Sequence, residues 1–144
     1  MTKKLSAEKD YILEMLHELQ DRSPANFLSE KDLKQVADSL NTTYSHVYGV
    51  ATYYTMFSLK PRGKYIIRIC NSPVCSMEGS ESITDVLKEL LGVRLGETTE
   101  DGLFSIEKAS CLGHCDIAPS MMVGKDVYGE LSRDRIMEIL AQYK

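Results

Sequence analysis

The segment KYIIRICNSPVC, residues 64–75, joins a short apolar run to two cysteines at its carboxyl end. The run is rich in β-branched residues, which favour strands, so it predicts a buried strand that ends at Cys70. A second segment, LFSIEKASCLGHC at residues 103–115, has the same design: an alternating strand pattern ends at Cys111, and Cys115 follows. All four cysteines of the chain lie in these two segments. Adjacent strands could therefore deliver two pairs of sulfur atoms to one edge of a sheet.

The hydrophobic pattern changes its period at SLKPRGKY, residues 58–65, where Pro61 and Gly63 interrupt any helix. Before this point apolar residues recur only at helical spacing. After it the order is strand, helix, strands and a closing helix. We therefore predict an α+β fold with two domains, an N-terminal helical bundle at residues 1–60 and a βαββα domain at residues 61–144.

Capping signals indicate where several of these helices begin. Ser29 with Asp32 resembles a capping box, although Asp replaces the usual Glu. Ser80 or Ser82 is a possible cap for the helix after the first cysteine pair, and Ser132 for the closing helix.

The composition excludes several classes of protein. A formal charge of −4 and a pI of about 5.4 argue against a nucleic-acid surface built on bulk charge. No apolar run approaches the roughly 20 residues of a membrane span, so no membrane insertion is expected. The start of the sequence lacks the apolar region of a secretory signal, which favours a cytoplasmic location. In the cytoplasm thiols stay reduced, and paired cysteines there are more often metal-binding or catalytic than disulfide-bonded.

The cysteine spacings are Cys70-x4-Cys75 and Cys111-x3-Cys115. Four thiolates can hold a zinc ion, a [2Fe–2S] cluster or a [4Fe–4S] cluster. Zinc sites usually use the shorter CxxC, so a structural zinc protein with four cysteine ligands is the less favoured alternative. A [2Fe–2S] cluster has two irons that each need two protein sulfurs, which suits two separate pairs.

The two cysteine loops also contain residues that could tune such a site. Serines could donate hydrogen bonds to sulfur, glycines could let backbone amides approach, and prolines could stiffen the loops, although all three are ordinary in turns. The candidates are Ser72, Pro73, Ser76, Gly79, Ser110, Gly113 and Pro119.

At these residues the sequence resembles the thioredoxin-like [2Fe–2S] ferredoxin family. Within that family it looks most like the small iron–sulfur electron-transfer subunit of NADH dehydrogenases, the E-type subunit of complex I. Similar subunits occur in NAD-linked formate dehydrogenases and in NAD(P)-dependent or electron-bifurcating hydrogenases. The resemblance rests on the cysteine spacings and on three motifs: VYGVATYYTMFSLKPRGKY (47–65), GETTEDGLFSIEKASCLGHCDIAPSMMV (96–123) and VYGELS (127–132).

The resemblance implies a thioredoxin-like fold for residues 64–144, with Cys70 and Cys75 on one iron and Cys111 and Cys115 on the other. It also implies a partner subunit that carries FMN and oxidises NAD(P)H, in a larger complex with a hydrogenase, a formate dehydrogenase or a quinone-reducing module. The chain would exchange single electrons with that flavin and do no bond chemistry itself.

Two positions depart from the family pattern and bear on the cluster potential. The first loop reads CNSPVC where a Gly-Thr-Ala type of insert is more usual, and His114 stands where a small residue is usual. His114 could titrate beside the cluster or replace a cysteine ligand, as histidines do in Rieske centres.

The predicted N-terminal helical bundle allows two interpretations of its function. Tyr44, Tyr48, Tyr53 and Met56 are expected to be exposed, and aromatic residues and Met favour a protein interface, here with the flavin subunit. The alternative is a redox-sensing helix-turn-helix regulator that binds DNA through residues 33–54. No Lys or Arg occurs in residues 41–57, so that helix would lack phosphate anchors, and we expect no nucleic-acid partner.

Overall fold

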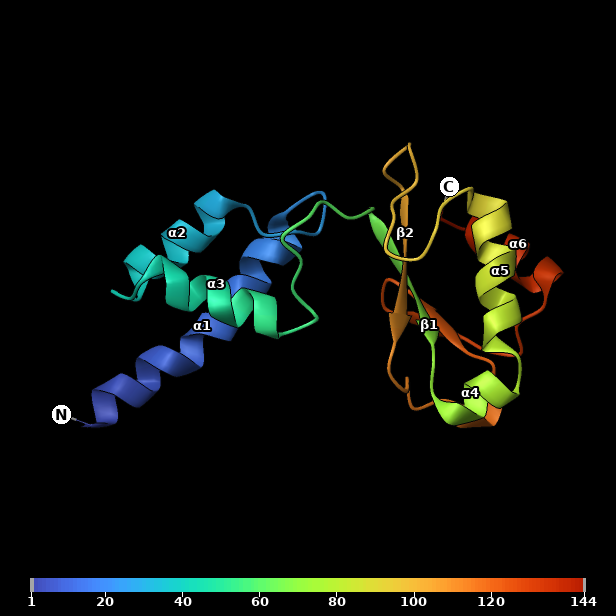
Figure 1. Ribbon diagram of the computed structural model, residues 1–144, viewed down its shortest axis with the longest axis horizontal. Helices are drawn as coiled ribbons and strands as arrows, with labels where there is room; N and C mark the ends of the chain where they lie inside the picture. Colours follow the sequence, from blue (N-terminus) through green and yellow to red (C-terminus); the bar gives the residue numbers. More distant parts are fainter. Residues whose placement is uncertain (1, 144) are drawn as a thin grey trace. The chain divides into compact units, whose positions relative to one another are not determined.

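The computed structural model describes residues 2–143, with side chains from Tyr11 onwards. The chain divides into two compact units between Arg62 and Gly63 (Figure 1). Among the helices described, none combines the length and the apolar character that crossing a membrane requires.

The first unit consists of three helices: α1 (Thr2–Arg22), α2 (Glu30–Ser39) and α3 (Tyr44–Tyr53). Their apolar stripes meet in one core, because residues three and four apart share a helix face. The buried side chains are Ile12, Leu16, Leu28, Leu33, Val36, Ala37, Val47, Ala51 and Phe57.

Side chains fix the connections of this unit. The predicted capping box at the start of α2 is confirmed: the Ser29 amide donates to Asp32 Oδ2 at 2.7 Å, and the Asp32 amide donates to Ser29 Oγ at 3.3 Å. The buried side chain of Gln20 joins α1 to the segment after α3. Its amide group donates to the Met56 carbonyl at 3.0 Å and accepts from the Ser58 amide at 2.8 Å.

The second unit is a four-stranded sheet with helices. Its elements are β1 (Tyr65–Cys70), α4 (Pro73–Met77), α5 (Ser80–Leu91), β2 (Phe104–Ala109), β3 (Met121–Val123), β4 (Asp126–Tyr128) and α6 (Arg133–Ala141), with a 3₁₀ turn at Cys115–Ile117. The strand order is β2-β1-β3-β4. Strands β1 and β2 are parallel, and the other pairs are antiparallel.

Helices α5 and α6 lie together on one side of this sheet (Figure 1). Alternate residues of a strand point to the same face, so Ile67 and Ile69 of β1 join Phe104 and Ile106 of β2 in the core under these helices. This topology confirms the predicted α+β fold, a helical bundle followed by a thioredoxin-like domain.

Two local expectations are corrected near the first cysteine pair. Helix α5 begins at Ser80, and its N-cap is Gly79 with φ +93°, so neither Ser80 nor Ser82 is the cap. The CNSPVC segment, expected to be a loop, contains the short helix α4. Ser72 is the N-cap of α4, and Pro73 lies in its first turn, where its fixed φ suits a helix start.

Gly129 lies where the chain after β4 passes the 3₁₀ turn. A Cβ at this position would collide with the Ile117 carbonyl oxygen and come within 2.5 Å of Ile117 Cβ. We therefore expect Gly129→Ala to lower the free energy of unfolding by about 1–3 kcal/mol, as overpacking does. Chemical denaturation followed by circular dichroism measures this change.

Gly49→Ala is the control, because a Cβ at Gly49 of α3 meets no atom within 4 Å. Alanine is the better helix former, so this variant should be as stable as the parent or more stable. Equal effects of the two substitutions would contradict the close approach at Gly129.

Candidate metal centre

The register of two parallel strands brings the cysteine loops to the same edge of the sheet. In the β1–β2 ladder Cys70 pairs with Ala109, so Cys111 follows just beyond the partner of Cys70. The Asn71 amide continues the ladder by donating to the Ala109 carbonyl at 2.9 Å. Across the gap between the loops, the Leu112 backbone amide forms a hydrogen bond with the Cys70 sulfur. The loops therefore converge, although β2 ends at Ala109 and not at Cys111, where the sequence predicted its end.

The first cysteine pair is buried. Cys70 ends β1 and Cys75 lies in α4, and each is 1% exposed. Cys70 Sγ is 3.4 Å from Ser72 Oγ, and Cys75 Sγ is 3.6 Å from Ser120 Oγ. Although Ser72 is the N-cap of α4, its hydroxyl makes no capping bond and faces the sulfur instead.

The second pair is exposed. The Sγ atoms of Cys111 and Cys115 lie 3.9 Å apart, and the Gly113 amide donates to Cys111 Sγ at 3.4 Å. Gly113 has φ +83°, a conformation that favours glycine, so its identity preserves the turn that aims this amide at sulfur. None of the four cysteines forms a disulfide.

The thiols influence one another's protonation. Burial raises the pKa of Cys70, but hydrogen bonds with the Ser72 hydroxyl and amide, the Leu112 amide and Cys75 together lower it from 9.0 to about 7. The pKa of Cys115 is raised by its hydrogen bond to Cys111 and by the negative charge of Cys111, with smaller contributions from burial, Cys75 and Cys70. Cys115 therefore becomes a thiolate less readily beside the other cysteines, and a bound cation would favour its thiolate, which is the form that binds metal.

The donor set consists of two separate cysteine pairs. Within the part of the chain that the structure describes, no three His, Cys, Asp or Glu side chains are grouped to hold a single ion. The sulfurs instead form one pair on β1 and α4 and one pair in the segment after β2. Two pairs of soft thiolate ligands fit a two-iron cluster, in which each iron takes one pair.

The other residues singled out in the sequence lie at different distances from the sulfurs. Ser72 and Gly113 contact sulfur, as described above. Ser76 and His114 are exposed, and neither has a hydrogen bond to a sulfur within the described residues. Gly79 has open space around its Cα, so it serves the left-handed backbone at the start of α5 and does not make room for sulfur. Pro119 follows Ala118 through a cis peptide bond.

Sequence reasoning missed Ser120. It is 1% exposed, and both its hydroxyl and its backbone carbonyl contact the first cysteine pair. No sequence pattern around Ser120 indicates this contact, because the contact depends on the pairing of β1 with β3.

Comparisons with known proteins identify the family of this chain. Residues 1–144 match the family described as thioredoxin-like [2Fe-2S] ferredoxin. The chain belongs to this family, and its cofactor is accordingly a [2Fe–2S] cluster.

Several curated proteins are similar over almost the whole chain. The NADP-reducing hydrogenase subunit HndA of Solidesulfovibrio fructosivorans is 35% identical over 139 residues, which are 96% of this chain and 80% of that protein. The E subunit of the NADH-quinone oxidoreductase of Aquifex aeolicus is 38% identical over 136 residues, which are 94% of this chain and 84% of that protein.

A solved structure supports the fold. The crystal structure of an NAD⁺-reducing [NiFe]-hydrogenase in the H₂-reduced state aligns with a TM-score of 0.79 over 92% of this chain, at 22% identity. This chain spans only 22% of that hydrogenase chain.

The lowered pKa of Cys70 generates a prediction for the metal-free chain. We expect thiolate absorbance at 240 nm to show one group titrating near pH 7, because the Ser72 hydroxyl stabilises the Cys70 thiolate. Ser72→Ala should move this step towards pH 9. The free energy of unfolding should rise as the pH increases through 7, since the native chain releases this proton before the unfolded chain does.

Ser76→Ala, an exposed change in the same short helix, should leave the titration unchanged. An identical titration in the Ser72 and Ser76 variants would contradict the role of the Ser72 hydroxyl.

Proposed function

We propose that this chain is the electron-transfer subunit of a multisubunit oxidoreductase. In this proposal Cys70 and Cys75 hold one iron of the [2Fe–2S] cluster, and Cys111 and Cys115 hold the other. The observation that carries the proposal is the convergence of two free cysteine pairs at one sheet edge, with a backbone hydrogen bond between their loops. The cluster supplies one-electron transfer, and the chain holds it and controls its surroundings.

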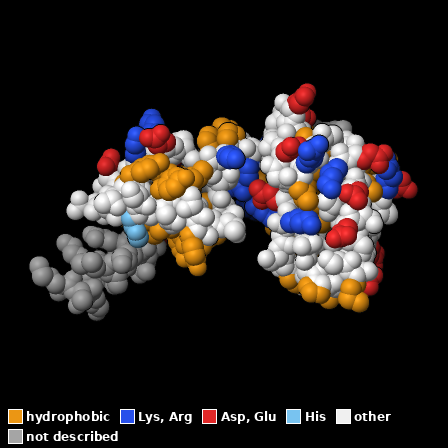
Figure 2. Space-filling view, viewed as in Figure 1, with side chains coloured by type: hydrophobic (Ala, Val, Ile, Leu, Met, Phe, Trp, Pro, Cys, Tyr) orange, Lys and Arg blue, Asp and Glu red, His pale blue; other side chains and the backbone are white. Residues whose placement is uncertain are grey.

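The unequal exposure of the two pairs supports this role. The buried pair sits behind the Ser72 and Ser120 hydroxyls, whereas Cys111 and Cys115 face solvent. Near the buried pair, Val74 and Met77 of α4 are 44% and 87% exposed. Figure 2 shows hydrophobic side chains gathered at the end of the second unit where α4 lies. An electron-transfer partner could therefore approach the exposed cysteines over a partly apolar surface.

The proposed partner is a flavin-containing protein that oxidises NAD(P)H. A hydride carries two electrons, and a flavin can pass them singly to an iron–sulfur cluster. The names of the relatives, which are components of an NADP-reducing hydrogenase and of an NADH-quinone oxidoreductase, favour this partner class. These names point to different larger complexes, so the proposed further partner is a hydrogenase, a formate dehydrogenase or a quinone-reducing module. The cytoplasmic location stays a prediction.

Cluster binding can be tested on the recombinant chain. The anaerobically reconstituted protein should contain about two irons per chain and, when reduced by one electron, give a [2Fe–2S] EPR signal. Cys111→Ser should lower the iron content and the signal, because one iron loses a thiolate ligand. Iron analysis and EPR measure both effects.

Ser110→Ala is the matched control, since Ser110 is the exposed neighbour of Cys111 and supplies no ligand. It should keep the full iron content. A colourless protein with one zinc per chain, or wild-type iron in Cys111→Ser, would overturn the ligand assignment.

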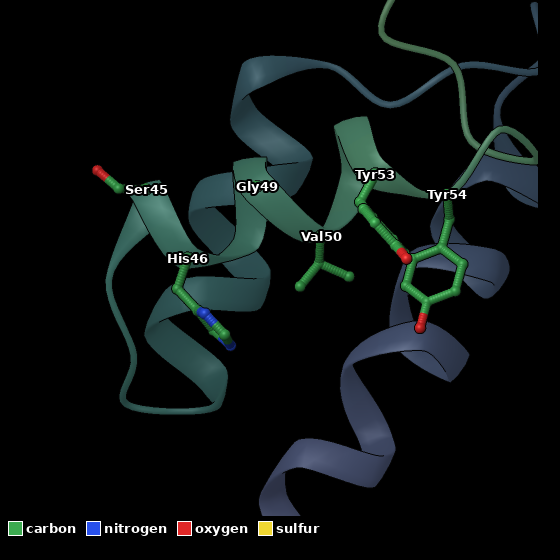
Figure 3. Close-up of a pocket in the computed structure, with 6 residues that line it drawn as sticks. All are labelled: Ser45, His46, Gly49, Val50, Tyr53 and Tyr54. Carbon is green, nitrogen blue, oxygen red and sulfur yellow. The ribbon is translucent and has the colours of Figure 1, made fainter.

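We propose further that the two units are separate domains and that the helical one binds the flavin subunit. The residues expected at this interface, Tyr44, Tyr48, Tyr53 and Met56, are 37–80% exposed. Figure 3 shows the neighbouring groove along α3, with Val50 between His46 at one end and Tyr53 and Tyr54 at the other. Exposed aromatic side chains in a segment, residues 41–57, that contains no Lys or Arg favour a protein partner over DNA.

The interface can be tested by charge introduction. Tyr48→Glu and Tyr53→Glu should each lower the capture of the flavin subunit by the tagged chain at least about tenfold, because a buried carboxylate would lack a partner. The readout is FMN and NAD(P)H-oxidising activity in the captured fraction.

Tyr11→Glu is the matched control, because Tyr11 is 56% exposed on α1 and lies outside the proposed interface. Equal capture by all three variants would contradict the interface, and capture of duplex DNA would favour the regulator.

A further inference from the structure

Ser120 lies opposite Cys70 in the sheet. The β1–β3 register pairs Ile67 with Val123 and Ile69 with Met121, and its next step places Ser120 beside Cys70. The Cys70 amide donates to the Ser120 carbonyl at 3.1 Å, so the last residue of β1 is held by β3 as well as by β2. This backbone contact does not depend on the identity of the side chain.

The Ser120 hydroxyl makes a second, independent contact. It is buried with its residue, which is 1% exposed, and its Oγ lies 3.6 Å from Cys75 Sγ. Among the described residues this sulfur is the only hydrogen-bond partner that the structure gives the hydroxyl. A metal-bound thiolate can only accept, so the hydroxyl has to donate to it or remain unsatisfied, which is unfavourable for a buried group.

We propose that Ser120 is a positioning residue that sets the reduction potential of the cluster by donating a hydrogen bond to Cys75 Sγ. The inference rests on the proposed function, in which Cys75 is an iron ligand. One-electron reduction adds one negative charge to the site, and a donor aimed at sulfur stabilises the more negative state. Removing the donor therefore makes the potential more negative.

Ser72 provides a comparison, because its hydroxyl also lies beside a cysteine sulfur. Ser72 faces Cys70 Sγ at 3.4 Å but is partly exposed, so water can replace its hydroxyl. Water has no such access to the site of Ser120. The loss of the Ser120 hydroxyl should thus change the potential more than the loss of the Ser72 hydroxyl.

The test is a redox titration of Ser120→Ala in the reconstituted full chain, followed by visible absorption and EPR. We expect iron content near that of the parent and a decrease of up to about tenfold in the equilibrium constant for reduction. A tenfold decrease corresponds to a potential about 59 mV more negative for a one-electron couple. Ser72→Ala should give a smaller shift in the same direction.

Ser105→Ala is the matched control for a purely structural effect. Ser105 is also a buried serine of the sheet, and its hydroxyl bonds to the Gly63 amide at 2.7 Å and to Thr98 Oγ1 at 2.7 Å. Its loss should lower the free energy of unfolding without moving the potential.

If Ser120→Ala does not fold, the isosteric pair Ser120→Thr and Ser120→Val isolates the hydroxyl, and the Val variant should have the more negative potential. Equal potentials in Thr and Val, or an unchanged potential in an iron-loaded Ser120→Ala, would overturn the inference. A parent chain without a two-iron cluster would instead refute the proposed function, so the two failures are distinguishable.

Discussion

The parallel pairing of β1 with β2 is the constraint on which the sulfur site depends. Their register is set by the core, since Ile67 and Ile106 are directly paired and both fully buried. A slip by one residue would turn these side chains out of the core, so the register is strongly specified. The close approach of Gly63 to the Phe104 backbone anchors the start of the pairing. The hydrophobic core thereby fixes how far Cys70 lies from Cys111, although neither sulfur belongs to the core under α5 and α6.

The two cysteine pairs are held by different means, and the difference has a chemical consequence. Strand β1, helix α4 and the approach to β3 enclose Cys70 and Cys75, so the contact between the Ser120 hydroxyl and Cys75 Sγ is shielded from water. Cys111 and Cys115 lie in an exposed segment shaped by Gly113, where water competes for each contact. The buried side is thus suited to control the energy of the site, and the exposed side to accept a partner.

The sequence predicted the features that are determined by residues close together in the chain. The strand that ends at Cys70, the capping box at Ser29 and the closing helix after Ser132 all follow from local patterns. Helix α4 was missed because its five residues are too short to show helical periodicity, and Pro73 was taken as a loop residue. The contact between Ser120 and Cys75 was beyond sequence reasoning, since it arises from antiparallel pairing of residues far apart in the chain.

The division into two units separates two physical requirements. All four cysteines and both hydroxyls that face sulfur belong to residues 63–144, where a four-stranded sheet supplies rigidity. The exposed tyrosines that stand out in the sequence belong to residues 1–62, on a helix held by a small apolar core. The sulfur site lies on the scaffold of the sheet, and the tyrosines proposed for binding lie in the other unit. Substitutions of these tyrosines therefore leave the cysteines and the hydroxyls that face sulfur in place.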